Sequence, residues 1–174
     1  MCGISGFNWE DKGLIEKMND VNRHRGPDDR GDFSDPEVTL GHTRLSIIDL
    51  SALGHQPLCN ESKTLWITYN GEVCNFREIR AELENKGYSF RSNPDTEVVL
   101  KAYEEYGSDC LNKFNGMWAI CIYDIQKKEF FLARDRSGIK PLYYYSDGKK
   151  FIFSSMIGAI IQHYIEVLSD NAVL

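Results

Sequence analysis

Cys2 is the residue of this chain with the clearest potential for chemistry. Removal of Met1 would leave a first residue that carries both a thiol and a free α-amine. An α-amine has a reference pKa of about 7.7–8.0 and can accept the thiol proton, so one residue would supply both nucleophile and base. Taken alone, a cysteine at a chain end is more often an incidental, oxidisable residue. The catalytic interpretation therefore needs support from the rest of the sequence.

The segment Asn70-Gly71-Glu72 is the second candidate, because it directly follows a β-rich run and precedes a predicted helix. A tight turn is the commonest meaning of Asn-Gly. The carboxamide NH₂ of Asn70 and the backbone N–H of Gly71 could also converge on one carbonyl oxygen. Two such donors form an oxyanion hole, which stabilises a tetrahedral transition state.

Arg44 and Asp95 offer opposite charges at the ends of predicted elements. Singly, they are typical of a strand-end arginine and of an aspartate that caps a helix. Together they offer a cation for an α-carboxylate and an anion for an α-ammonium, the two charged groups of a free amino acid. The run Arg134–Lys140 could bind an anion, although a solvated loop between strands is the simpler interpretation.

The elements that must position these residues follow from hydrophobic periodicity. The pattern predicts a strand at 3–9, a helix at 12–22, a polar turn at 23–31, strands at 38–45 and 65–69, a helix from 76 that ends before Gly87, and a helix at 96–106 with Asp95 as N-cap and Gly107 at its end. Four consecutive antiparallel strands follow at 117–123, 130–134, 142–145 and 150–153. Segregated runs of strands and helices favour an α+β fold over a doubly wound one.

Composition excludes several classes of protein. The chain has 174 residues, enough for one sizeable core, and a formal net charge of −6, which gives nucleic-acid binding no global support. No apolar run reaches the ~20 residues of a membrane span, and the first ten residues lack a secretory signal, so we expect a cytoplasmic protein. The five cysteines are odd in number and irregularly spaced, so no disulfide framework is predicted. They and His24, His42, His55 and His163 lack metal-ligand spacing, and no glycine-rich nucleotide-binding motif is present.

Several blocks in order along the chain resemble class II glutamine amidotransferase domains, in particular the N-terminal domain of glutamine-hydrolysing asparagine synthetases. The resemblance extends from Cys2 to about Ile161. It is carried by Met1-Cys2-Gly3-Ile4, Arg23-His24-Arg25-Gly26-Pro27-Asp28, Gly41-His42-Thr43-Arg44-Leu45-Ser46-Ile47, Tyr69-Asn70-Gly71-Glu72, Asp95-Thr96-Glu97, and Arg134-Asp135 through Pro141-Leu142-Tyr143.

The resemblance implies an N-terminal-nucleophile (Ntn) hydrolase fold, a four-layer α-β-β-α sandwich of two antiparallel sheets. It also implies removal of Met1 and attack of the Cys2 thiolate on the side-chain amide of L-glutamine, with ammonia released and a thioester hydrolysed to glutamate. Asn70 and Gly71 would hold the oxyanion. Glutamine would be bound by Arg44 at its α-carboxylate, by Glu72 and Asp95 at its α-ammonium, and by the backbone of Leu45, Ser46, Ile47 and Ile48, with Arg25 and Gly26 in support.

The same resemblance implies a partner. Ammonia would pass to a synthetase domain or subunit that makes asparagine from aspartate, and ATP and magnesium would belong to that domain, so no cofactor is expected here. The family's ATP-pyrophosphatase domain has no counterpart in residues 1–174, which we interpret as a single amidotransferase domain. The chain would then be a fragment, a truncated gene product or a stand-alone glutaminase subunit. We also allow for a homodimer.

Three positions depart from the family pattern. Cys74 stands where an aromatic residue is usual, and Met156 and Gly158 replace a glutamate and a lysine in a segment that faces the partner domain. The sequence therefore keeps a second hypothesis open, a non-catalytic module that binds glutamine or a partner without releasing ammonia. A third hypothesis is an N-terminal-cysteine amidase for another amide. Arg44 with Glu72 and Asp95 argues against it, because these groups recognise a free amino acid.

Overall fold

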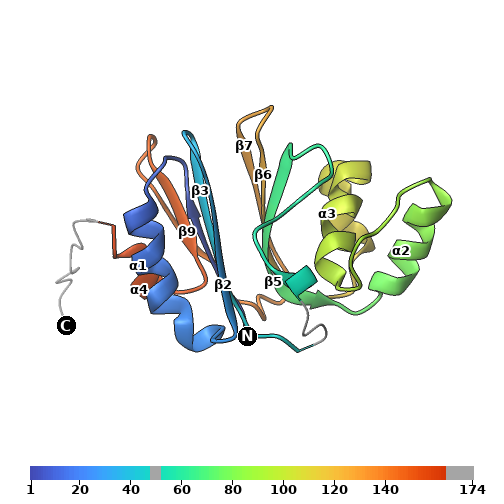
Figure 1. The fold of residues 1–174 in the computed structure, drawn as a ribbon, viewed down its shortest axis with the longest axis horizontal. Helices are drawn as coiled ribbons and strands as arrows, with labels where there is room; N and C mark the ends of the chain where they lie inside the picture. Colours follow the sequence, from blue (N-terminus) through green and yellow to red (C-terminus); the bar gives the residue numbers. More distant parts are fainter. Residues whose placement is uncertain (48–51, 164–174) are drawn as a thin grey trace.

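Two antiparallel β-sheets lie face to face at the centre of the computed structural model, which describes residues 1–47 and 52–163 (Figure 1). The first sheet has the order β2 (Asp29–Asp35), β3 (Val38–Arg44), β1 (Gly3–Phe7), β9 (Phe151–Ser154) and β8 (Tyr143–Ser146). The second has the order β4 (Leu58–Cys59), β5 (Leu65–Val73), β6 (Gly116–Asp124) and β7 (Glu129–Arg134). The first strand of the chain thus lies in the middle of its sheet.

Helices cover the outer face of each sheet (Figure 1). The first sheet is covered by α1 (Lys12–Asn22) and α4 (Ile157–Ile160), and the second by α2 (Phe76–Asn85) and α3 (Asp95–Tyr106). Helix α1 begins where the Asp11 carboxylate accepts a hydrogen bond from the Leu14 N–H at 2.9 Å. Gly107, at φ +57°, ends α3 in a conformation that glycine adopts without strain. The predicted four-layer α-β-β-α sandwich is confirmed.

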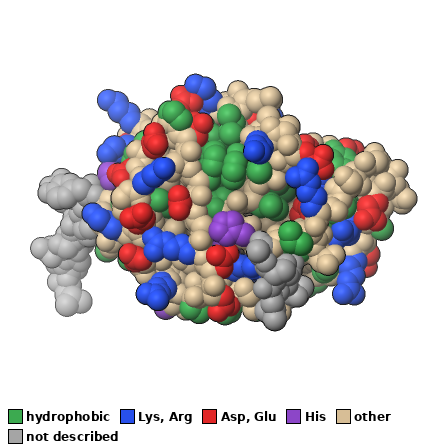
Figure 2. All heavy atoms as spheres, viewed as in Figure 1, with side chains coloured by type: hydrophobic (Ala, Val, Ile, Leu, Met, Phe, Trp, Pro, Cys, Tyr) green, Lys and Arg blue, Asp and Glu red, His purple; other side chains and the backbone are tan. Residues whose placement is uncertain are grey.

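Strand β6 shows why the sheets stack in this order. Its alternate residues Ala119, Cys121 and Tyr123 pack between the two sheets, while Trp118, Ile120 and Ile122 pack beneath the helices. Both of its faces are therefore buried, and the apolar area removed from water drives the layering. Figure 2 shows charged side chains of both signs interspersed on one face and hydrophobic side chains gathered between the sheets, at the end away from the N-terminus. The rings of Phe33 and Trp66 stack across the two sheets.

Three expectations about the strands were wrong. The predicted turn at 23–31 already contains the start of β2, which pairs with β3 from Asp29↔Arg44 onward. The short strand β4 lies in a segment that showed no strand pattern. The four C-terminal strands are antiparallel in two pairs, but β6 and β7 belong to the second sheet and β8 and β9 to the first. Strand pairing is non-local, so the pattern of one segment does not reveal its sheet.

Polar contacts connect the sheets near the N-terminal end of β1. The His42 Nε2–H donates to the Tyr69 carbonyl at 3.2 Å, and the Thr68 hydroxyl donates to the Gly41 carbonyl at 3.1 Å. Burial lowers the pKa of His42 to about 4, so its imidazole is neutral at pH 7. The His42 side chain therefore forms a bridging hydrogen bond between β3 and β5.

We expect this bridge to make stability depend on pH. Below pH 6.5 the unfolded chain protonates His42, while the folded chain does not until about pH 4, so stability falls as the pH drops through this window. At pH 5 the loss is on the order of 2 kcal/mol. His42→Gln should reduce the difference between the urea-unfolding free energies at pH 7 and pH 5, whereas the exposed control His24→Gln should not. An unchanged difference in His42→Gln would contradict this assignment.

Candidate active site

A cavity of about 130 Å³ opens beside the start of β1, where both sheets end. Its wall combines the first two residues, the segment after β3, part of β5 and the start of α3. It consists of Met1, Cys2, Arg44, Leu45, Ser46, Ile47, Gly54, Gln56, Tyr69, Asn70, Gly71, Glu72, Pro94, Asp95, Thr96 and Lys140. The structure thus brings together the predicted site residues apart from Arg25 and Gly26, which lie behind the cavity, and Ile48, which lies outside the described residues.

Cys2 is held at the mouth of this cavity by backbone contacts. The Leu45 N–H points at the Cys2 Sγ at 3.4 Å, and the Leu45 carbonyl lies 3.8 Å from the same sulfur. Behind Cys2, the Arg25 Nε–H donates to the Cys2 carbonyl at 3.1 Å. Burial lowers the pKa of Arg25, and the nearby Cys2 sulfur opposes that change by favouring the guanidinium charge. A backbone donor contacts the Cys2 sulfur, and a cation lies next to the same residue.

Gly26 allows the short helical turn Arg23–Arg25 to lie against the end of β3. A Cβ at Gly26 would be 2.3 Å from the Thr43 carbonyl carbon and 2.5 Å from the Arg44 nitrogen. These are backbone atoms of a paired strand and cannot move aside cheaply. Glycine is therefore required here by a close approach of two backbones, and it acts on the site only through the placement of Arg25 and Arg44.

Asn70 and Gly71 lie inside β5, where the sequence favoured a turn or a loop end. They pair with Ala119 and Trp118 of β6, and a Cβ at Gly71 would be 2.6 Å from the Met117 carbonyl oxygen. The Asn70 side chain is buried in the cavity wall, and its Nδ2 has no hydrogen-bond partner among the described residues. A buried NH₂ group without an acceptor is unusual and is available to an oxygen placed in the cavity.

Arg44 ends β3 with its side chain almost wholly buried in the cavity wall. Its guanidinium lies against the backbone of Gly54, where a Cβ would be 2.1 Å from the Arg44 Nη2. The short helical turn Ala52–Gly54 thus fits the arginine only because Gly54 has no side chain. The result is a fixed cation on one side of the cavity.

Asp95 was predicted as a helix cap, and the structure corrects this. Pro94 occupies the N-cap position, and Asp95 is the first residue of α3. The Asp95 Oδ2 accepts hydrogen bonds from the Tyr69 hydroxyl at 2.7 Å and the Val73 N–H at 2.9 Å. Burial raises the pKa of Asp95, although these two donors oppose the shift. The carboxylate is fixed in the wall through one oxygen, and Glu72 adds a second acidic group beside it.

Gln56 and Thr96 are cavity residues that sequence reasoning missed. The Gln56 Oε1 accepts from the Tyr69 N–H at 2.7 Å, and its Nε2 donates to the Thr96 hydroxyl at 3.3 Å. Gln56 therefore ties the segment after β3 to both β5 and α3. Its signal in the sequence is weak, because it lies in an irregular segment rather than in a periodic element.

Lys140 is a further missed residue, and it corrects the expectation of a solvated loop at 134–140. Gly54, Tyr69 and Pro94 also line the cavity without having been predicted. Asp135 is buried and accepts hydrogen bonds from the backbone N–H groups of Trp118, Ser137, Ile139 and Lys140. This arrangement lowers the pKa of Asp135 against the opposing effect of burial. The folded loop places the Lys140 side chain in the cavity wall, with its Nζ 3.6 Å from the Met1 sulfur.

A four-layer α-β-β-α sandwich of two antiparallel sheets, here with Cys2 directly before its central strand and a cavity beside that cysteine, is the Ntn-hydrolase fold. Two solved structures share this fold. One is glutamine phosphoribosylpyrophosphate amidotransferase from B. subtilis complexed with ADP and GMP, with a TM-score of 0.77, 21% identity, and coverage of 92% of this chain and 43% of that chain. The other, described as the allosteric regulatory enzyme of purine biosynthesis, has a TM-score of 0.81 at 21% identity and the same coverages.

The model of the glutamine amidotransferase domain family matches residues 1–174, and the chain belongs to this family. A putative glutamine-hydrolysing asparagine synthetase 2 of Methanocaldococcus jannaschii is 43% identical over 183 residues, covering 92% of this chain and 35% of the relative. The glutamine-hydrolysing asparagine synthetase 1 of Bacillus subtilis is 44% identical over 163 residues, covering 89% and 26%. The chain thus spans about a third or less of these two relatives.

Proposed function

We propose that this chain hydrolyses L-glutamine to glutamate and ammonia through a thioester on Cys2. One observation carries the proposal. The Cys2 sulfur, the Asn70 side chain and the opposite charges of Arg44 and Asp95 surround a single cavity, and the Asn70 Nδ2 has no hydrogen-bond partner among the described residues. A nucleophile, an oxyanion donor and two handles for a free amino acid are the groups that such a reaction requires.

The reaction would proceed in two steps once Met1 has been removed. In the first, the Cys2 α-amine takes the thiol proton, and the thiolate attacks the side-chain amide carbon of glutamine. The Asn70 Nδ2 and the Gly71 N–H stabilise the oxyanion, the amine returns its proton to the leaving NH₂ group, and ammonia departs. In the second, water attacks the thioester, and glutamate and the free thiol are released.

Recognition of glutamine would rest on the fixed charges of the wall. Arg44 would pair with the α-carboxylate, and Asp95 and Glu72 would pair with the α-ammonium. The backbone of Leu45, Ser46 and Ile47 would complete the pocket. Arg25 and Gly26 would support it from behind. Because Arg44 and Asp95 are both buried, their ion pairs with the substrate would be screened little by salt.

Gly54→Ala should weaken glutamine binding without unfolding the protein. The new Cβ would collide with the far end of the Arg44 side chain, which can move away, and not with backbone. Loss of one charge-assisted contact should raise KM about tenfold, with a smaller effect on kcat. Steady-state kinetics on glutamine test this. Gly158→Ala is the matched control, since its Cβ meets only Val21 at 3.5 Å; equal KM values in both variants would contradict the proposed role of Arg44.

We further propose that the ammonia serves asparagine synthesis from aspartate in a synthetase domain or subunit, which would hold ATP and magnesium. The names of the relatives from M. jannaschii and B. subtilis support this acceptor. We propose a cytoplasmic setting as well, supported by cysteines that are all free, as is usual in a reducing compartment. In the described parts of the chain, no helix has the length and apolar character needed to cross a membrane.

The test combines intact mass spectrometry with an assay for ammonia and glutamate on one sample of the purified chain. Loss of the Met1 mass together with release of both products in equal amounts supports the proposal. A chain that has lost Met1 and binds glutamine, yet releases no ammonia, overturns it in favour of a binding module. If Met1 is retained, the terminus is first trimmed by an aminopeptidase, and the assay is then repeated.

A further inference from the structure

A second cavity of about 190 Å³ is formed partly by the same elements as the first cavity, which is the glutamine pocket of the proposed function. The two cavities have no lining residue in common, but two elements contribute to both. Helix α3 presents Asp95 and Thr96 to the first and Lys101 to the second, and the segment after β3 presents Gly54 and Gln56 to the first and Leu58 to the second. Whatever fills the second cavity therefore touches the elements that shape the first.

Lys101 brings a positive charge to this cavity. Its side chain is only 6% exposed, and its Nζ makes no hydrogen bond among the described residues. The ammonium lies 5.7 Å from the ring centre of Tyr88 and 5.6 Å from that of Phe90. Ring faces attract a cation but do not accept its N–H groups as oxygen atoms do, so the rings leave these groups open to an anion in the cavity.

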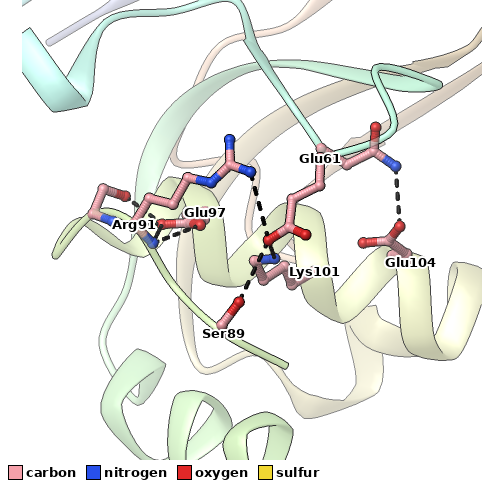
Figure 3. A network of polar contacts seen from close by, with 8 residues as sticks. Glu61, Ser89, Arg91, Glu97, Lys101 and Glu104 are labelled. Atoms are coloured by element: carbon pink, nitrogen blue, oxygen red, sulfur yellow. Dashed lines mark hydrogen bonds and ion pairs between the residues drawn. The ribbon is translucent and has the colours of Figure 1, made fainter. Parts of the chain in front are cut away.

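The carboxylates around Lys101 accept no hydrogen bond from its ammonium, although Glu61 forms a long ion pair with it (Figure 3). Glu97 is occupied by the Arg91 and Ser92 N–H groups and by the Ser92 hydroxyl, at 2.6–3.1 Å. Glu104 is turned to the Asn60 amide. Only Glu61 approaches, with its Oε1 at 3.6 Å from the Lys101 Nζ, too long for a hydrogen bond.

Glu61 is held loosely enough to be displaced. Its side chain is 53% exposed, and its other contacts are a 3.8 Å pair with Arg91 and a 3.4 Å hydrogen bond from the Ser89 hydroxyl. Exposed pairs of this kind contribute little to stability. An incoming anion could therefore take the place of the Glu61 carboxylate between Lys101 and Arg91.

We propose that the second cavity is a binding site for a small aliphatic carboxylate. Lys101 and Arg91 would hold its carboxylate, and Leu58 and Leu100 would contact its aliphatic part. A bound molecule would restrain the segment that carries Gly54 and Gln56, which preorganises the glutamine pocket and lowers KM. This last effect rests on the proposed glutaminase function, whereas the binding itself does not.

The experiment titrates the ¹⁵N-labelled chain with sodium butyrate and follows the amide signals of Ser92 and Lys101. We expect saturable shifts in the unmodified chain. Lys101→Met, which keeps the stem without the charge, should weaken binding about tenfold or more, and Glu61→Gln, which removes the competing carboxylate, should strengthen it. Lys86→Met is the control, because Lys86 pairs with Glu105 outside the cavity.

Neutral butyramide should cause no such shifts. Equal butyrate affinity in Lys101→Met and the unmodified chain would overturn the proposal, as would the absence of saturable shifts in Glu61→Gln. Inorganic phosphate that binds where butyrate does not would overturn the choice of a carboxylate. In kinetic assays, butyrate should lower KM for glutamine in the unmodified chain and not in Lys101→Met. A raised KM would show competition at Arg44 instead, and binding without any change in KM would overturn only the coupling.

Discussion

Replacing Cys2 with alanine is expected to reduce kcat for glutamine hydrolysis by on the order of 10⁴-fold or more. The substitution removes the sulfur that the Leu45 N–H contacts at 3.4 Å, and with it the thioester route. Two other cysteines, Cys59 and Cys74, are not buried, and neither of them lines the cavity beside Cys2. The measurement is the rate of glutamate and ammonia formation, each determined separately, with the N-terminal residue of every sample established by mass spectrometry.

Two comparisons make the result for Cys2 specific. Cys74→Ala should keep its activity, because the exposed Cys74 lies two residues beyond Glu72 and outside the cavity wall. Cys2→Ala should still bind glutamine in calorimetry, since Arg44 and Asp95 remain. Unchanged turnover in Cys2→Ala would disprove the thioester mechanism, and loss of turnover in both variants would point to a general effect on the fold.

Asn70→Ala should lower kcat by about 10²–10³-fold and change KM much less. The Asn70 Nδ2 has no partner among the described residues, so its removal breaks no hydrogen bond of the resting protein there. The loss would therefore fall on the transition state, where the oxyanion needs the donor. Steady-state kinetics separate the two parameters, and thermal unfolding of the same sample shows whether β5 remains intact.

A second substitution at this position sharpens the test. Asn70→Asp keeps the size of the side chain and replaces the donor by a negative charge, which would repel the oxyanion. It should be at least as inactive as Asn70→Ala. A variant Asn70→Asp that retains full kcat would rule out Asn70 as an oxyanion donor, as would a loss of activity expressed only in KM.

The sequence predicted elements whose signals are local and missed those whose signals are not. Helix α1 is found over the predicted range because its apolar stripe and its Asp11 cap lie within a few residues of each other. Asn70-Gly71, by contrast, has strong turn propensity, yet it lies within β5 because β6 pairs with it from almost fifty residues away. Tertiary pairing overrode local preference here.

The same distinction between local and non-local signals applies to the candidate site. Cys2, Asn70, Arg44 and Asp95 could be named in advance because their types suggest chemistry, and the structure places all four around one cavity. The other predicted site residues were named from the family resemblance, and of these Arg25 and Gly26 do not line the cavity. The positions of Gln56 and Lys140 depend on how an irregular segment and a loop fold back, as with the hydrogen bonds from Gln56 to β5 and α3. No periodicity or charge pattern encodes such contacts. Asp95 was identified, but its attachment to Tyr69 and Val73 could only come from the structure.

The central position of β1 sets an order of events during synthesis. Strand β1 pairs with β3 on one side and with β9 on the other, and β9 contributes Ser154, Phe153 and Ile152 to this pairing. The ribosome must therefore add about 150 further residues before the strand behind Cys2 gains its second neighbour. At ~5–20 residues per second, the second neighbour of β1 is completed roughly 8–30 s after β1 itself. Removal of Met1, which the proposed mechanism requires, would have this interval in which to act on a loosely held chain end, before the completed sheet fixes Cys2 in place.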